Sequence, residues 1–229
     1  MAFNNWRIGL ESLGIFVLQH SFGKKSIRGF AAWDDYAPLV AVNTAYHKTA
    51  RIYTLFHEIG HLLTRKDASC LKFLSPEDEN FDSHLATERW CERFSAAFLM
   101  PSEIFSEIAS SMNPGSNEII QDIDIVRKIA KKFKVSIRAT SLRLQELDLA
   151  PSGFYSRVER TLNNYDWPNS GGGGRGRVAP RKRLDELGTS LVQVIFDAQK
   201  RDRMNELAVA DYLNLTTGQV NELRNTILA

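Results

Sequence analysis

A pair of histidines four residues apart, with a glutamate after the first, is the feature of this chain best suited to chemistry: His57-Glu58-Ile59-Gly60-His61. On an α-helix, residues four apart lie on the same face, so two imidazoles can bind one ion. Glu58 lies one step round the helix, where it can take a proton from a metal-bound water but is badly placed to be a ligand. This is the HExxH arrangement of zinc metallopeptidases. A buried site, rather than a packed histidine pair, is favoured by the flanking apolar residues Leu55, Phe56, Ile59, Leu62 and Leu63.

A catalytic zinc needs a third protein ligand, and three residues are candidates. Asp67 would require a sharp turn after the motif, but Thr64 occupies the position where glycine would allow that turn. His84 has suitable chemistry but lies at the expected start of the next helix. Glu88 is the favoured candidate, and Asp67 and His84 remain the alternatives.

Glu88 is favoured because its helical neighbours are apolar or small: Leu85, Cys91 and Ser95. A carboxylate on such a face costs free energy unless it is paired or bound to a cation. Glu92, one turn later, could accept a hydrogen bond from the free N–H of a histidine ligand, or it could be a solvated helix residue.

The elements that must position these residues follow from the same sequence. A helix is expected over 5–13, and the helix with the motif over about Thr49–Leu63. Three β-like stretches lie between them: Ile15–Gln19, Ile27–Trp33 and Pro38–Val42. After a polar connection, a second helix covers about His84–Leu99 and ends before Pro101. The predicted fold class is α+β, with a small β-sheet packed on the HExxH helix and a mainly helical C-terminal region.

The rest of the chain is expected to be helical apart from one linker. Two short helices joined at Val135-Ser136 follow Ile119, and two or three more cover Leu184–Lys200 and Glu206–Leu228. Glycine and arginine dominate the stretch between them, which predicts a flexible connection. The predicted domains are 1–112 for the metal site, 113–168 for a helix-turn-helix-like region, 169–183 for the linker and 184–229 for a C-terminal helical region.

Basic residues gather in the helix pair that joins at Val135-Ser136: Arg127, Lys128, Lys131, Lys132, Lys134, Arg138 and Arg143. Their helix-turn-helix-like spacing is compatible with DNA binding. We favour the alternative, in which the apolar residues pack this pair on the rest of the protein while the lysines face water. Acidic residues in the same region dilute the positive charge, namely Asp122, Asp124, Glu146 and Asp148.

Composition gives no case for a membrane or for strong electrostatic attraction to nucleic acid. The 229 residues are 43% hydrophobic and 24% charged, with a net charge of +2. No apolar run approaches the roughly 20 residues that span a bilayer, and the N-terminal residues lack the apolar stretch of a secretion signal. Two cysteines, Cys70 and Cys91, are too few for a disulfide framework. We therefore expect a cytoplasmic protein.

Two segments together resemble the ImmA/IrrE family of zinc metallopeptidases: Phe56–Leu63, with the HExxH motif, and Glu88–Pro101, which reads ERWCERFSAAFLMP. Gly14–Val17 and Pro38–Asn43 also resemble the strands that precede the motif helix in that family. The family pattern carries alanine and asparagine where this chain has Cys91 and Glu92. The resemblance covers about residues 6–101 specifically, and the C-terminal region only loosely.

The resemblance implies a zincin-like fold with Zn²⁺ held by His57, His61 and Glu88, and with Glu58 as the base that assists attack by the metal-bound water. It also implies a cytoplasmic endopeptidase whose protein substrate is a helix-turn-helix transcriptional repressor, in stress responses or mobile genetic elements. The competing hypothesis is a DNA-binding or repressor-binding transcriptional regulator whose metal site is structural or vestigial.

Overall fold

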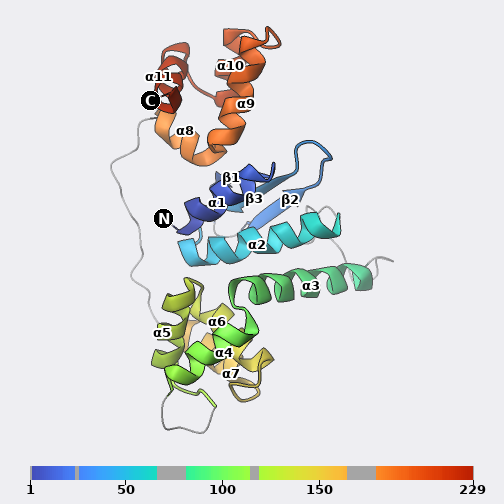
Figure 1. The fold of residues 1–229 in the computed structure, drawn as a ribbon, viewed down its shortest axis with the longest axis vertical. Coiled ribbons are helices and arrows are strands. Elements are labelled where there is room, and N and C mark those ends of the chain that lie inside the picture. The colour runs from blue at the N-terminus through green and yellow to red at the C-terminus, as the bar shows by residue number, and fades with distance from the viewer. Residues whose placement is uncertain (1, 24–25, 66–80, 114–118, 164–178, 229) are drawn as a thin grey trace.

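The computed structural model describes residues 2–23, 26–65, 81–113, 119–163 and 179–228 (Figure 1). Its sheet consists of three short strands: β1 (Phe16–His20), β2 (Gly29–Ala32) and β3 (Leu39–Asn43). The order is β1-β3-β2, with β3 parallel to β1 and antiparallel to β2. The three β-like stretches of the sequence are therefore confirmed. Val40, Ala41 and Val42 are buried, as expected of a central strand covered on both faces.

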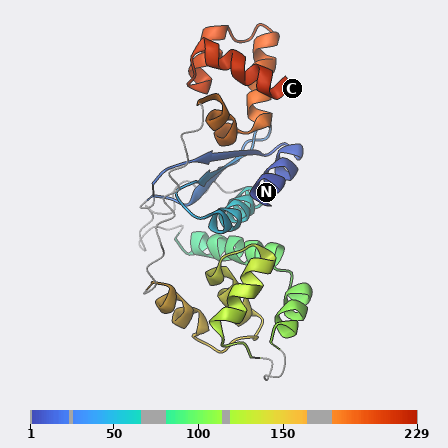
Figure 2. The ribbon, with the colours of Figure 1, turned by 90° about the vertical axis from the view of Figure 1, so that its left-hand side faces the viewer.

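The motif helix, α2 (Lys48–Thr64), lies between the sheet and the next helix (Figure 2). It extends one residue beyond the predicted Thr49–Leu63 at each end. Its first turn is capped by Nδ1 of His47, which accepts a hydrogen bond from the backbone N–H of Thr49, and it ends at Arg65 in a left-handed conformation. A preceding helix, α1 (Ala2–Ser12), packs against α2 through the edge of the Trp6 ring on Phe56. The ring contact places α1 against the Phe56 side of α2.

The second predicted helix is α3 (Phe81–Leu99), which packs along α2 and ends before Pro101 as expected. The two helices approach closely where Gly60 faces Cys91. A Cβ atom at Gly60 would lie 3.0 Å from the sulfur of Cys91 and 3.2 Å from its Cα. Cys91 is fully buried, so its interpretation as a small core residue fits the structure. The absence of a side chain at Gly60 therefore sets the distance between the two helices that carry the candidate ligands.

Gly60→Ala is expected to lower the stability of the protein, whereas Gly9→Ala should raise it. Replacing glycine with alanine inside a helix raises the free energy of unfolding by about 1 kcal/mol, but overpacking a close contact lowers it by about 1–3 kcal/mol. At Gly60 the backbone of Cys91 must move, so the free-energy cost of overpacking exceeds the gain in helix propensity. Gly9 lies on the exposed side of α1 with no atom within 4 Å of an added Cβ, so the gain is realised there. Urea unfolding of both variants measures the difference, and a stabilised Gly60→Ala protein would contradict this account of the α2–α3 contact.

Four further helices complete the core under α3: α4 (Ser102–Ser111), α5 (Ile123–Phe133), α6 (Ile137–Glu146) and α7 (Phe154–Asn163). The two short helices that the sequence predicted are α5 and α6, whereas α4 and α7 were not predicted. Buried side chains from α1 to α7 form one continuous hydrophobic cluster that includes Leu55, Phe105 and Phe154. The domain limits drawn from the sequence stay a prediction.

A second hydrophobic cluster belongs to α8 (Ala179–Leu187), α9 (Thr189–Lys200), α10 (Glu206–Leu213) and α11 (Thr217–Leu228). These are four helices rather than two or three, because each of the two predicted stretches is interrupted: the first at Gly188, with φ at 84°, and the second at Asn214, with φ at 48°. Residues 169–178 of the predicted linker lie outside the described part, and Ala179 already begins α8.

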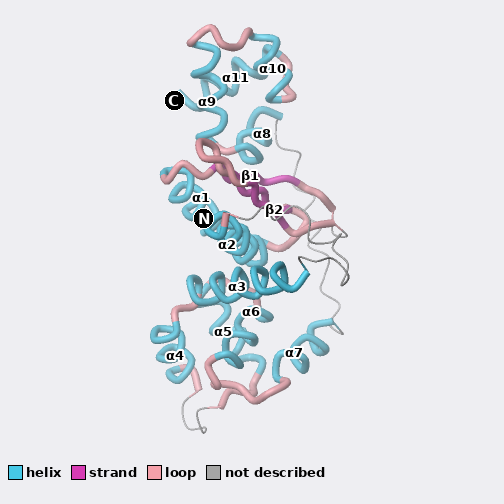
Figure 3. The backbone as a smooth tube through the Cα atoms, turned by 90° about the vertical axis from the view of Figure 1, so that its right-hand side faces the viewer, coloured by secondary structure: helices cyan, strands magenta, loops and turns pink. Residues whose placement is uncertain are grey.

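The C-terminal helices sit beside β1, at the opposite end of the protein from α4–α7 (Figures 1 and 3). The buried guanidinium of Arg7 in α1 joins the C-terminal helices to the sheet. It donates hydrogen bonds to the backbone carbonyls of Val17 in β1 and of Asp185 and Glu186 in α8. Among the described residues, no helix combines the length and the apolar composition needed to cross a membrane.

Candidate metal centre

The two motif histidines lie on the same face of α2, as their spacing predicts. Their ring centroids are 5.0 Å apart and their Nε2 atoms 3.2 Å apart. The carboxylate of Glu88 reaches them from α3, with Oε2 at 3.1 Å from Nε2 of His57 and Oε1 at 2.8 Å from Nε2 of His61. The fold thus brings together, at one point, three side chains that are up to 31 positions apart in the sequence.

The spacing of these atoms suits a tetrahedral cation. Two ligand atoms about 2.0–2.1 Å from a zinc ion, at a tetrahedral angle, lie about 3.3 Å from each other. His57, His61 and Glu88 present one ligand atom each, all within 4.8 Å of one another, and they are the one such group among the described residues. Two imidazoles and a carboxylate are a donor set that zinc, manganese or iron can use. The residues present therefore fit a divalent cation.

The charge state of Glu88 also suits a ligand. Burial raises the pKa of this carboxyl group, but hydrogen bonding to His57 and His61 and their charge outweigh burial and lower the pKa to about 2. Glu88 is therefore ionised at neutral pH. Of its two competitors, Asp67 lies outside the described residues. His84 lies in the first turn of α3, and its side chain is likewise outside them.

Glu58 lies beside the cluster, on the side of α2 that faces the sheet. Its side chain is buried, and its Oε2 atom has no hydrogen-bond partner among the described residues. Burial raises the pKa of Glu58 to about 7, against the opposing charges of the two histidines. A buried carboxylate with a free oxygen next to a candidate cation site is placed to accept a proton.

The sequence analysis missed Gly29, which allows the strand β2 to approach Glu58. A Cβ atom at Gly29 would lie 3.0 Å from Oε1 of Glu58, 2.7 Å from Cγ2 of Thr54 and 2.8 Å from the carbonyl oxygen of Ala41. A glycine inside a β-like stretch is the sequence signal for such a close approach.

Gly29→Ala is expected to lower the rate of any reaction in which Glu58 accepts a proton, while leaving metal binding in place. The added methyl group must push β2 or the Glu58 carboxylate aside, and small displacements of a catalytic group can cost up to about 100-fold in rate. The atoms nearest to the added Cβ belong to Thr54, Ala41 and Glu58 and to none of the three candidate ligands, so metal content should be unchanged. Steady-state kinetics with metal analysis tests this, and an Ala variant with normal kcat would show that the close approach is not needed.

Glu92 does not make the hydrogen bond expected of it. Its side chain is exposed, and among the described residues it makes no hydrogen bond to either histidine; its backbone carbonyl accepts a hydrogen bond from the hydroxyl of Tyr53 at 3.0 Å. Nδ1 of His61 is buried without a described hydrogen-bond partner. The alternative of an exposed helix residue therefore describes Glu92 better in this structure.

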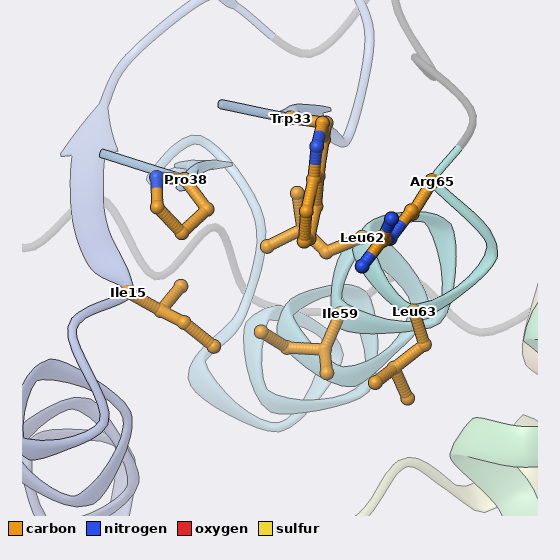
Figure 4. A pocket seen from close by; sticks show the side chains of 7 residues that line it. All are labelled: Ile15, Trp33, Pro38, Ile59, Leu62, Leu63 and Arg65. Carbon is orange, nitrogen blue, oxygen red and sulfur yellow. The ribbon is translucent and has the colours of Figure 1, made fainter. Parts of the chain in front are cut away.

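An apolar hollow of about 260 Å³ lies near the end of α2 but away from the metal centre (Figure 4). Its walls include Ile15 and Ile59, and the guanidinium of Arg65 stacks over the ring of Trp33 at 5.0 Å. Ile59 is two positions from His57, which is roughly 200° round the helix. The hollow and the candidate ligands therefore lie on different sides of α2.

Comparison with known proteins agrees with this geometry. A family model for the IrrE N-terminal-like domain (Peptidase_M78) matches residues 10–145, which is more than half of the chain. The matched segment contains the HExxH motif, Glu88 and every strand of the described sheet. No curated protein matches the chain.

Proposed function

The chain belongs to the IrrE N-terminal-like family of metallopeptidases, and on that premise we propose that it is a zinc-dependent endopeptidase that cleaves a regulatory protein. The observation that carries the proposal is the convergence of His57, His61 and Glu88 on one point, with the buried Glu58 beside it. A divalent ion held by the three ligands would supply Lewis acidity, which lowers the pKa of a coordinated water to about 7 and polarises a peptide carbonyl.

Glu58 is the residue to which we assign proton transfer. It would accept a proton as the water attacks the peptide and return it to the leaving amine. Its side chain is buried, so bulk water does not compete for its free oxygen. Two nearby side chains, those of His47 and Tyr53, already have structural partners. His47 caps α2, and the Tyr53 hydroxyl is bonded to the backbone of α3.

The position of β2 supports a peptide as the substrate. In the described part of the chain, β2 pairs with β3 along one edge, and the structure shows no strand on its other edge. An extended peptide can add to such an edge through backbone hydrogen bonds. Because Gly29 of β2 lies against Glu58, a peptide bound there would have its backbone next to the candidate base.

The nature of the substrate rests on the family resemblance. A transcriptional repressor with a helix-turn-helix domain, in a stress response or a mobile genetic element, is the substrate class that we propose, with action in the cytoplasm. Zinc is the proposed metal because two imidazoles and one carboxylate match its preferred donors.

Metal analysis and a cleavage assay test the proposal together. Purified protein is expected to contain one divalent ion per chain, and to cut at least one member of a panel of helix-turn-helix repressors at a defined peptide bond. Chelation should stop cleavage and added zinc should restore it. One tightly held ion with no cleavage of any panel member, and no effect of Glu58→Gln on any function, would instead favour the regulator with a structural metal site.

A further inference from the structure

The connection between α10 and α11 has the form of a helix-turn-helix. Three residues join the helices, and the first, Asn214, adopts a left-handed conformation with φ at 48°. The next, Leu215, donates its N–H to the carbonyl of Ala210 at 3.0 Å. Thr216 and Gln219 then form a reciprocal capping box, in which each side chain accepts a hydrogen bond from the backbone N–H of the other.

The helix pair α5–α6 repeats this local form step by step. Lys134 takes the left-handed position with φ at 57°, and the N–H of Val135 bonds to the carbonyl of Ala130 at 3.1 Å. Ser136 then caps α6 by accepting from the N–H of Ala139. The protein therefore contains the same helix–turn–helix geometry twice, and exposure of the second helix distinguishes the two copies.

In the first copy the second helix is covered by its own domain. Of the ten residues of α6, only Arg138 and Glu146 are exposed, and Thr140 and Ser141 are fully buried. Arg143 donates to the carbonyl of Met100 and so fastens α6 beneath α3. A helix covered in this way cannot enter a DNA groove. Our preference against DNA binding by residues 123–147 stays a prediction, and the burial of α6 is the observation that supports it.

In the second copy the second helix is open on one side. Val220 and Leu223 of α11 are fully buried in the C-terminal cluster, whereas Thr217, Asn221 and Asn225 are exposed. Gly218 has no atom within 4 Å of an added Cβ. The helices α10 and α11 lie at the outer end of the protein, with α8 between them and the sheet (Figures 1 and 3). The face of α11 is polar, and amide side chains are the groups that pair with adenine in the major groove.

A basic loop precedes the first helix of this pair. Lys200, Arg201 and Arg203 are exposed and lie immediately before Asn205, the residue that caps α10. Neither Arg201 nor Arg203 has an ion pair among the described residues, and Lys200 has one contact of 3.6 Å with Asp197. In helix-turn-helix proteins the first helix crosses the phosphate backbone while the second enters the groove. Cations at the start of α10 are therefore placed for phosphates.

We propose that the C-terminal unit α8–α11 binds double-stranded DNA, with α11 in the major groove and the loop 200–203 on the phosphates. This inference goes beyond the peptidase activity and does not depend on it. Acidic residues near the same surface reduce its positive charge: Asp202 in the loop itself, and Glu206, Asp211 and Glu222 on α10 and α11. We therefore expect the affinity for DNA of mixed sequence to lie in the usual non-specific range, with Kd about 10⁻⁴–10⁻⁶ M at physiological salt.

Fluorescence anisotropy with the full chain and a labelled 30-base-pair duplex of mixed sequence tests the phosphate contacts. Affinity should fall as salt rises, and the double variant Arg201→Ala with Arg203→Ala should reduce the slope of log affinity against log salt by about 1–2. The matched control is Arg181→Ala with Lys182→Ala, which removes the same charge from α8. The second control is Lys131→Ala with Lys132→Ala on α5. Neither control should change the slope.

The contribution of α11 is tested with a duplex enriched by the wild-type protein from a random pool. Asn221→Ala with Asn225→Ala should bind this duplex no better than the mixed-sequence duplex, with an unchanged salt slope. Circular dichroism confirms that each variant is folded. No duplex binding by the wild type at 50 mM salt would overturn the proposal, as would loss of binding in the α5 control instead of the loop variant. Unaltered sequence preference in the α11 variant would overturn the placement of α11.

Discussion

Glu58→Gln is expected to lower kcat for peptide cleavage by about 10²–10⁴-fold while the fold and the bound metal stay in place. Glutamine keeps the shape of the side chain in its buried position next to Gly29, but an amide cannot accept the proton of the attacking water. None of the three candidate ligands is altered, so metal content should match that of the wild type. Cleavage rates, metal analysis and circular dichroism measure the three quantities separately.

Glu92→Gln is the matched control for this variant. It removes the same charge close to the same site, but from an exposed side chain without a hydrogen bond to either histidine. It should therefore keep near-normal kcat. A Glu58→Gln protein as active as the wild type would remove Glu58 from the mechanism, and equal losses in both variants would point to a general effect of charge.

The part of the site that could be predicted from sequence depends on local geometry. Spacing by four places His57 and His61 on one face in any helix, and the structure shows both on α2. Glu88 could be selected because its helical neighbours include Cys91 and Ser95, both fully buried in the structure. In each case one helix and its periodicity carry the inference.

The environment of Glu92 and Gly29 depends on packing between elements, which periodicity does not fix. The rotation of α3 is set where Cys91 meets the bare backbone of Gly60, and this rotation leaves Glu92 in solvent. Gly29 reaches Glu58 because β2 pairs with β3 at the edge beside α2. Both facts require the sheet and the two helices to be assembled first.

Charge was a poor guide to which helix pair faces solvent. The basic residues of α5 and α6 drew the DNA-binding interpretation to 123–147, yet α6 is buried against the rest of its domain. The pair α10–α11 carries three acidic side chains (Glu206, Asp211 and Glu222) and one arginine (Arg224), yet it has the exposed second helix. Exposure follows from tertiary packing, including helices α4 and α7, which the sequence analysis did not anticipate.

Glu88→Ala is expected to cost both metal affinity and peptidase activity. Loss of a residue that only supports a ligand typically costs 10–100-fold in metal affinity, so loss of a ligand itself should raise Kd by more than about 100-fold. The Glu88 carboxylate lies 2.8 and 3.1 Å from the two imidazoles and is held ionised by them, so no other described group can replace it at this point. Competition with a chelator of known affinity measures Kd for zinc, and the cleavage assay measures activity in the same samples.

Two controls make this prediction specific to the third ligand. Glu92→Ala removes an exposed carboxylate one turn along the same helix and should leave zinc affinity nearly unchanged. Asp67→Ala tests the competing ligand and should likewise keep both affinity and activity. If Asp67→Ala loses zinc while Glu88→Ala retains it, the Glu88 carboxylate is no more than an ion-pair partner of His57 and His61. Asp67 would then replace Glu88 as the third ligand.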